Sequence, residues 1–287
     1  MQRTLPFVLL LLLPAVLQAE TGYDAWLRYV QLEDQALRRY RDTVPAVIVG
    51  VGAAVPVQSA RSELVRGLRG MLNRNLRVES RVAAEPAIVL GTVADLRQSA
   101  PQLAPAGNLE VDGFWLRTVR TNGTRFIVIA GQNERGVLYG SFALLRKIAL
   151  GESITDIDQR ENPYSPIRWI NHWENLDGSI ERGYGGRSIF WENGQAREDL
   201  SRVTDYGRML ASLGINGCSI NNVNADPRVL SPEFLPQIVR VADALRPWGV
   251  KVVISVDFGS PRSVGGLTTF DPLDPSVIAF WKKKISP

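Results

Sequence analysis

The feature that most constrains the fold is an alternation of strand-like and helix-like segments that repeats three times after Pro166. Each repeat opens with a short apolar run, and a segment with apolar residues at helical spacing follows it. The three runs are IRWINHW (167–173), INGCSINNV (215–223) and VKVVISVDF (250–258). Strands that alternate with helices form a parallel sheet with right-handed crossovers. We therefore expect a parallel α/β sheet in this half of the chain.

The helices of these repeats are predicted over residues 197–213, over residues 232–247 and from Asp274 onward. Ser231 before Pro232, and Asp274 before Pro275, are typical of helix N-termini. A complete (β/α)8 barrel takes about 250 residues, and the three repeats occupy all of the chain after Ile167. The pattern alone leaves two architectures open, a small open α/β domain and a barrel cut off before halfway.

The first half of the chain has a different pattern, which predicts a compact mixed α/β domain over residues 20–150. Asn122-Gly123 stands between two alternating apolar runs, a strong signal for a β-hairpin. Apolar residues at helical spacing and short β-branched runs mark the other elements. We expect helices at 24–40 and 59–73, strands that start near Pro45 and Ala87, a hairpin at 114–131 and a helix that ends near Ala149.

The extreme N-terminus resembles a secretory signal. Arg3 precedes an apolar run at 5–17, and Ala19 supplies a small residue where cleavage would fall. We predict a signal peptide over residues 1–19 and an exported protein, periplasmic or secreted, with no membrane attachment after cleavage. An uncleaved membrane anchor is the alternative. The lone Cys218 cannot form an internal disulfide, which is compatible with export.

Charge and motifs argue against several classes of function. The net charge of +4 is scattered, with no long run of like charges, so we expect no nucleic-acid partner. The sequence lacks the G-x-x-x-x-G-K-[ST] loop of nucleotide-binding proteins and the G-x-S-x-G turn of serine hydrolases. His172 is the chain's only histidine, so a multi-histidine metal site is ruled out, and we expect neither a metal nor an organic cofactor.

All three predicted strands end in polar or acidic residues. In parallel α/β folds, ligands gather at the carboxyl ends of the strands. Amides and carboxylates beside an indole suit a sugar, whose hydroxyls donate and accept while its C–H face packs on the ring. The structural alternatives are a core Trp173 and loop-capping asparagines. The residues concerned are Asn171, His172, Trp173, Glu174, Asn175 and Asp177, then Asn221, Asn222, Asn224 and Asp226, and finally Asp257.

The longest of these strand ends also resembles a known family. RWINHWENLDGSIERGYGGRSIFW (168–191) is similar to the first barrel strand and loop of the family-67 glycoside hydrolases, the bacterial and fungal α-glucuronidases. GINGCSINNVNA (214–225) resembles their second strand, and GYDAWLRY (22–29) resembles the opening of their N-terminal domain. GQNERGVLYGSFALLR (131–146) fits the helix that closes that domain.

The resemblance implies an α/β fold with a small mixed α/β N-terminal domain (20–150), followed over 151–287 by the first three βα units of a (β/α)8 TIM barrel, truncated. Such enzymes act in xylan degradation. They remove α-1,2-linked glucuronic acid, or its 4-O-methyl ether, from xylo-oligosaccharides with inversion and without a cofactor. The family places its general acid and its base on later barrel strands, here beyond Pro287. It also implies that the full-length form is a homodimer and that the 287-residue chain is inactive alone.

The resemblance further implies which residues bind the sugar acid. Trp173 resembles the tryptophan that walls the uronic-acid site, and Val223 resembles the apolar contact near the O4 substituent. Their polar neighbours are expected to help: Asn171, His172, Glu174, Asn175, Asn221 and Asn222. A non-catalytic carbohydrate-binding protein that retains the pocket is the alternative, and a relative of the N-acetylhexosaminidases is a weaker one. The reading frame downstream of Pro287 separates the first two.

Overall fold

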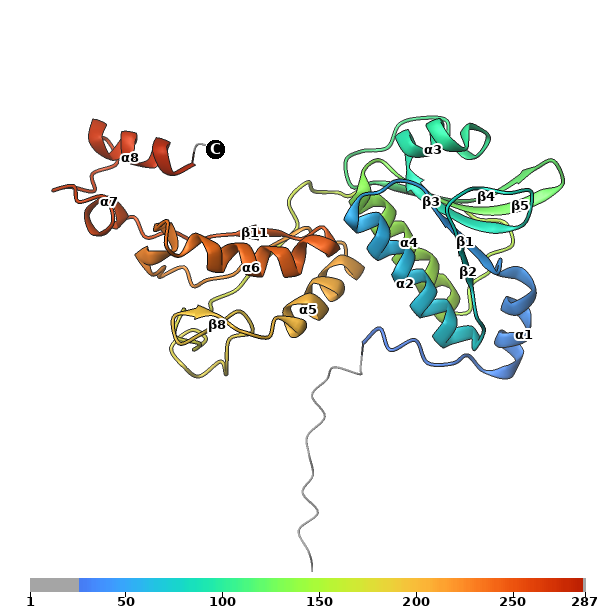
Figure 1. Ribbon diagram of the computed structural model, residues 1–287, viewed down its shortest axis with the longest axis horizontal. Helices are drawn as coiled ribbons and strands as arrows, with labels where there is room; N and C mark the ends of the chain where they lie inside the picture. Colours follow the sequence, from blue (N-terminus) through green and yellow to red (C-terminus); the bar gives the residue numbers. More distant parts are fainter. Residues whose placement is uncertain (1–25, 286–287) are drawn as a thin grey trace, which may run out of the picture.

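The computed structural model describes residues 26–285, so the predicted signal peptide (1–19) lies outside the described residues. Within that range the N-terminal half is built on a six-stranded sheet with strand order β2-β1-β3-β5-β4-β6 (Figure 1). Its strands are β1 (Val47–Gly50), β2 (Arg77–Glu79), β3 (Ala87–Thr92), β4 (Phe114–Thr121), β5 (Thr124–Gly131) and β6 (Asp158–Glu161).

The sheet is parallel except for β4, which runs antiparallel to both of its neighbours. The predicted hairpin is confirmed, because Asn122 and Gly123 join β4 to β5. Both residues have positive φ (49° and 76°), which a two-residue type I′ turn requires. The central strand β3 is buried along its whole length, as its continuous apolar run predicts.

Two long helices cover one face of this sheet and a shorter one covers the other. α2 (Val55–Leu72) and α4 (Glu134–Ala149) pack side by side on the first face, and α3 (Val93–Ser99) lies on the second (Figure 1). The apolar spacing that predicted a helix at 59–73 is confirmed, because Leu64, Leu68 and Leu72 lie on one side of α2 and are fully buried. Each face therefore closes its own apolar core.

The helix predicted at 24–40 is wrong over residues 26–33. α1 spans only Asp34–Thr43, and residues 26–33 form an irregular segment that lies across α2. Leu27 and Tyr29 have positive φ (48° and 50°), which a helix excludes. The Tyr29 hydroxyl donates to Glu63, 2.5 Å away, so a contact with a residue distant in sequence overrides the local helical pattern.

The second half contains the predicted parallel sheet, with strand order β11-β10-β7. Cys218 in the central strand pairs with Ile170 on one side and Val252 on the other. The strands are shorter than the apolar runs that predicted them. Their bounds are β7 (Trp169–Asn171), β10 (Gly217–Ser219) and β11 (Lys251–Val253), with helices α5 (Ser201–Ser212), α6 (Leu235–Leu245) and α8 (Pro275–Ile285).

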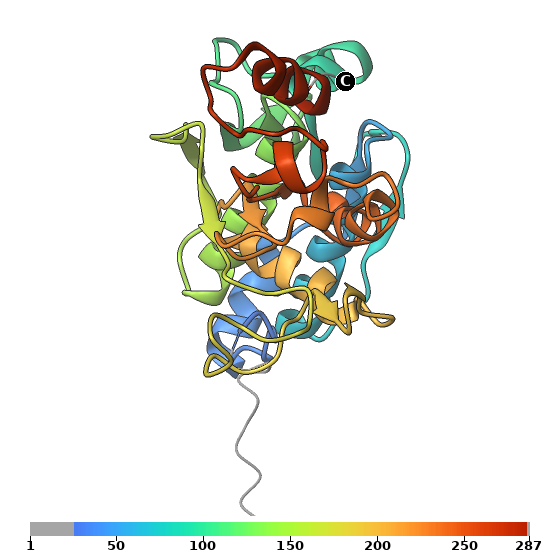
Figure 2. The same cartoon turned by 90° about the vertical axis from the view of Figure 1, so that its left-hand side faces the viewer.

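Smaller elements complete this half: the hairpin β8 (Trp191–Glu192) and β9 (Gln195–Ala196), and the short helix α7 (Ser260–Ser263). Figure 2 views the molecule from the end that carries α7 and α8. The predicted start of α8 is confirmed, since the Asp274 carboxylate accepts from the Ser276 N–H at 2.8 Å. Ser231 does not cap α6. Residues 231–234 form a turn instead, in which the Phe234 N–H donates to the Ser231 carbonyl.

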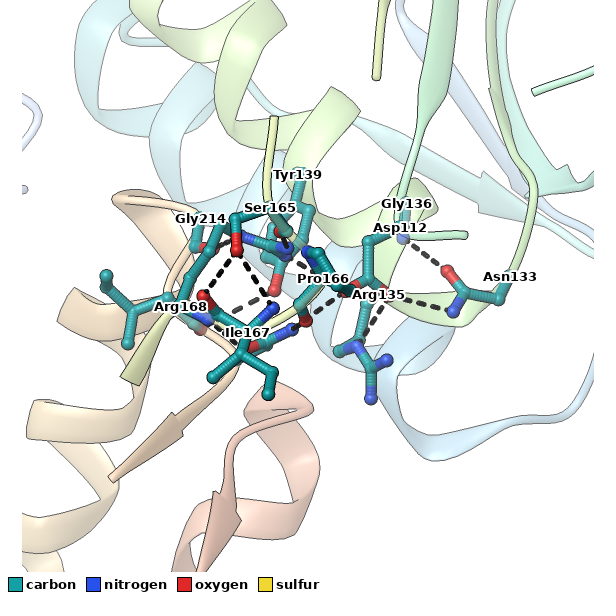
Figure 3. Close-up of polar contacts among 12 residues, drawn as sticks. Asp112, Asn133, Arg135, Gly136, Tyr139, Ser165, Pro166, Ile167, Arg168 and Gly214 are labelled. Carbon is teal, nitrogen blue, oxygen red and sulfur yellow. Dashed lines mark hydrogen bonds and ion pairs between the residues drawn. The ribbon is translucent and has the colours of Figure 1, made fainter. Parts of the chain in front are cut away.

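The two halves are joined by two ionic contacts, each of which has a buried carboxylate. Arg208 of α5 donates to Glu63 of α2 through Nη2 at 2.7 Å, and both side chains are almost fully buried. The carboxylate of Asp112, which precedes β4, accepts from Arg168, which precedes β7, at 2.9 Å (Figure 3). One apolar cluster also runs through both halves, in which α5 and the short helix η4 (Arg246–Trp248) pack on α4 and α2. No helix within 26–285 is long and apolar enough to cross a bilayer.

Candidate functional site

The structure brings the ends of β7 and β10 together. Asn171 pairs with Ser219 at the last rung of the two parallel strands. Beyond that rung the backbones stay linked, because the Asn222 N–H donates to the Glu174 carbonyl at 2.8 Å. The segments that follow the two strands in sequence therefore lie side by side at the carboxyl edge of the sheet.

Three of the predicted ligand residues are exposed at this edge. Trp173 is 44% exposed and Val223 is 46% exposed, and Asn171 is exposed at the end of β7. Exposed apolar side chains such as these gain free energy when a ligand removes them from water. Trp173 is therefore not the core aromatic that was considered as an alternative.

Glu174 is buried, and the protein itself uses both of its carboxylate oxygens. One oxygen accepts from the Ser188 hydroxyl and from the Ile189 N–H at 2.9 Å. The other lies 3.1 Å from Nδ1 of His172. Buried charged groups are tolerated when they are paired and hydrogen-bonded in this way. The side chain thus ties the end of β7 to the far side of the loop at 178–187.

His172 continues this network toward α5. Its Nε2 lies 2.7 Å from the Tyr206 hydroxyl, and its ring meets Tyr206 and Phe190 edge-on. Glu174 faces Nδ1 and the Tyr206 hydroxyl faces Nε2, so both ring nitrogens have a polar partner. Burial raises the pKa of Tyr206, which keeps its hydroxyl protonated.

The asparagines of the second strand end brace the backbone. Asn221 exchanges two hydrogen bonds of 2.9 Å with the backbone of Ser255, beyond β11. Asn222 accepts from the Asn224 N–H at 2.9 Å and reaches the Trp173 carbonyl at 3.4 Å. Both amides are buried, and they extend the sheet through side chains after the backbone ladder stops.

Asn175 fixes the loop that follows β7. Its Nδ2 donates to the Ser179 hydroxyl at 2.9 Å and to the Glu181 carbonyl at 2.8 Å. The sequence could not identify Ser188, Tyr206 and Ser255 as partners in these networks. Serine and tyrosine at such positions carry no local pattern, and the folded strand ends alone bring them into contact.

The remaining acidic residues of the strand ends are also engaged locally. Asp177 accepts from the Ser179 hydroxyl and N–H, and the hydroxyl in particular holds the pKa of Asp177 below its usual range. Asp257 accepts from the Gly259 N–H at 3.0 Å. A general acid in glycoside hydrolysis needs a raised pKa, so Asp177 is poorly suited to that role.

Two further observations limit the chemistry of the strand ends. Burial raises the pKa of the Cys218 thiol to about 12, so the thiol is inert at neutral pH. Within residues 26–285, no three histidine, cysteine or acidic side chains lie close enough to hold a metal ion. The strand ends thus expose the apolar side chains of Trp173 and Val223 together with polar ones such as Asn171.

Comparison with known proteins agrees with this architecture. The model of the glycosyl hydrolase family 67 N-terminus matches residues 25–144, and the model of the family's middle domain matches residues 147–287. A family GH115 4-O-methyl-α-glucuronidase with specificity for decorated arabinogalactans has a similar fold. It superimposes with a TM-score of 0.55 at 17% identity, over 84% of this chain and 34% of that one.

Curated relatives are much closer in sequence. An alpha-glucuronidase of Hypocrea jecorina is 47% identical over 291 residues, which cover 96% of this chain and 34% of the relative. A probable alpha-glucuronidase A of Aspergillus terreus is 42% identical over 282 residues, covering 96% of this chain and 33% of the relative. The chain thus spans about a third of the length of these relatives. Because the two family models together match most of its length, this chain belongs to glycoside hydrolase family 67.

Proposed function

We propose that this chain supplies the sugar-acid subsite of an α-glucuronidase. The enzyme would release α-1,2-linked glucuronic acid, or its 4-O-methyl ether, from xylo-oligosaccharides. The observation that carries the proposal is that Trp173 and Val223 are both exposed, each just beyond one of two neighbouring strands, in a chain whose relatives are named alpha-glucuronidases. The substrate is thus a glucuronic-acid-substituted xylo-oligosaccharide, and the reaction needs no metal or organic cofactor.

In this subsite the exposed residues contact the sugar and the buried ones hold them in place. Trp173 packs on the C–H face of the uronic acid, and Val223 lies beside its O4 substituent. Asn171 is an exposed polar residue available to a hydroxyl. The buried Glu174 and Asn222 support the backbone around Trp173. Because their polar atoms are already paired, their proposed role is positioning.

The remaining parts of the proposal concern the whole protein. β7, β10 and β11 are the first three strands of a (β/α)8 barrel, within a catalytic domain at 151–287 that follows an N-terminal domain at 20–150. The general acid and the base lie beyond Pro287, about 6.5–9.5 Å apart as an inverting mechanism requires. The full-length form is an exported homodimer.

The direct test is release of glucuronic acid from aldouronic oligosaccharides. The 287-residue chain is compared with the longer protein obtained by extending the reading frame past Pro287. We expect activity only in the longer protein, because the strand-end carboxylates of this chain are engaged in local hydrogen bonds. Activity of the short chain would overturn our placement of the acid and base. Binding without activity in both forms would favour a non-catalytic carbohydrate-binding protein.

A substitution tests the subsite itself. In the longer protein, Trp173→Ala removes the indole and should lower kcat/KM by about thirtyfold, the effect of losing about 2 kcal/mol of contact energy. Tyr164→Ala is the matched control, because this aromatic side chain is fully exposed and follows no strand of the second sheet. Equal kinetics for the two variants would remove Trp173 from the subsite.

A further inference from the structure

A second concave site lies on the N-terminal half, away from the strand ends. The irregular segment at 26–33 and the outer face of α2 enclose a groove of about 640 Å³. Arg28, Arg66 and Arg69 line it and are exposed, and the buried Arg208 lies at its base. Within the described chain, no acidic residue lines this basic groove.

The wall of the basic groove is preformed. Leu27 and Tyr29 hold backbone conformations that cost about 1–3 kcal/mol each, and such strain persists only where the surroundings enforce it. The Tyr29 hydroxyl is fixed by Glu63, and the Leu27 carbonyl accepts from Arg208 at 2.9 Å. Gly70 allows the close approach, because a Cβ there would lie 2.6 Å from the Tyr29 carbonyl oxygen.

The charge of the basic groove is largely uncompensated. Arg208 is neutralised by Glu63, which it contacts at 2.7 Å. Arg66 approaches the same carboxylate only to 3.8 Å and remains 59% exposed. Arg28 and Arg69 form no ion pair with any residue in 26–285, so at least two guanidinium groups face solvent together without a partner.

These arginines are also not needed to cap α2. The last carbonyls of this helix carry partial negative charge, which nearby cations usually offset. Arg41 already donates to the Leu72 and Asn73 carbonyls at 3.4 and 3.5 Å. Arg66 and Arg69 lie one helical turn apart on the same face, so their guanidinium groups can act on one ligand.

We propose that the basic groove is a second binding site, for the carboxylate of a uronic-acid-bearing carbohydrate. Guanidinium groups bind carboxylates through paired, charge-assisted hydrogen bonds. Gln31 and Ser62, which also line the basic groove, supply neutral partners for hydroxyls. The choice of a uronate rests on the proposed function. This site would bind one uronic-acid side group of a polysaccharide while the strand-end subsite binds another.

The experiment measures binding by calorimetry in the 287-residue chain carrying Trp173→Ala, so that the strand-end subsite does not contribute. The ligand is an aldouronic oligosaccharide at physiological salt, and its counterpart is the same oligosaccharide with the carboxylate reduced to an alcohol. We expect binding of the first and loss of about tenfold or more for the second. Equal binding of the two would overturn the proposal.

Charge-reversal variants then locate the site. The double variant Arg66→Glu/Arg69→Glu should weaken binding by about tenfold or more. The control is the double variant Arg97→Glu/Arg120→Glu, which makes the same change of net charge on exposed residues elsewhere and should have little effect. An equal loss in both pairs would mean that only net charge matters, and would overturn the proposal. Displacement by equimolar inorganic phosphate would overturn the uronate assignment in favour of a general anion site. Failure of the proposed function is distinguishable from failure of this second site, because the proposed function is tested by glucuronic acid release and by the kinetics of Trp173→Ala in the longer protein.

Discussion

At the scale of single residues, Asp112 connects the two halves of the molecule. Its carboxylate is buried and accepts four side-chain hydrogen bonds of 2.7–3.1 Å (Figure 3). Two of the donors belong to the N-terminal half and two flank strands of the second sheet. The donors are Asn133, Arg135, Arg168 and Asn216. The Asp112 carboxylate therefore helps to position the starts of β7 and β10. Through these strands it also helps to position their carboxyl ends, where the candidate site lies.

Neutralising this carboxylate should destabilise the fold. Asp112→Asn leaves Arg135 and Arg168 without a compensating charge in a buried setting, which typically costs about 3–5 kcal/mol. We expect the free energy of unfolding, measured by urea denaturation, to fall by about that amount. Glu85→Gln is the control, because Glu85 pairs with Arg77 on the surface, where water and salt screen the pair, and it should change the stability little. Equal effects would mean that Asp112 is not a structural hub.

The same carboxylate predicts a pH dependence. Burial alone would raise the pKa of Asp112, but the hydrogen bonds from its four donors outweigh burial and lower the pKa to about 2. Because the folded pKa lies below the unfolded value of about 3.9, the stabilisation is complete above that value and is lost as the pH falls toward about 2. The difference in unfolding free energy between wild type and Asp112→Asn should therefore shrink over this window. A difference that stays constant down to about pH 2 would contradict the assignment.

At the scale of elements, α5 packs so closely that a glycine is required. A Cβ at Gly207 would lie 2.8 Å from the Trp248 ring and 3.1 Å from Leu245. Alanine normally stabilises a helix interior by about 1 kcal/mol relative to glycine, but here overpacking should cost about 1–3 kcal/mol. We expect Gly207→Ala to lower the melting temperature. Arg202→Ala, on the exposed face of α5, is the control and should change it little. A stabilised Gly207→Ala would contradict the packing.

The elements that the sequence predicted correctly are those whose signal is local. The apolar run of β3, the Asn122-Gly123 turn and the stripe of α2 each contain their own pattern. The short strands β2 and β6 were not predicted, because they are largely exposed and are defined by pairing with distant strands. Residues 26–33 were mispredicted for a related reason, since Glu63 holds Tyr29 out of a helix.

In the candidate site too, the sequence predicts the features with a local pattern and misses those that depend on distant partners. Strand ends are predictable from an apolar run that turns polar, and the exposure of Trp173 and Val223 fits a ligand-facing role. The hydrogen bonds that engage Glu174 and Asn221 were not predictable, because their partners come from other elements. Sequence pattern therefore located the surface, and only the fold separates side chains that can meet a ligand from those that support it.

At the scale of the whole molecule, the second sheet has two open edges. Within residues 26–285, β10 is the only strand that pairs with β7 or with β11, so the outer edge of each presents unpaired backbone groups. Around β7 the apolar side chains Ile167, Trp169 and Ile170 are exposed by 37–59%. Open, apolar strand edges recruit other chains. In a longer family-67 protein, further strands of the barrel would cover them, as our proposal requires.

The 287-residue chain should therefore associate with itself in solution. We expect light scattering coupled to size exclusion to give a mass that rises above 31.7 kDa as concentration increases. Ile170→Lys places a charge on the open edge of β7, and edge lysines oppose strand pairing, so this variant should remain closer to the monomer mass. Val111→Lys is the matched control, because Val111 is exposed in a loop outside both sheets and its replacement leaves the edge unchanged. A wild-type mass that stays at 31.7 kDa at every concentration would show that the edge of β7 is already protected. An equal improvement from both lysines would place the association elsewhere on the surface.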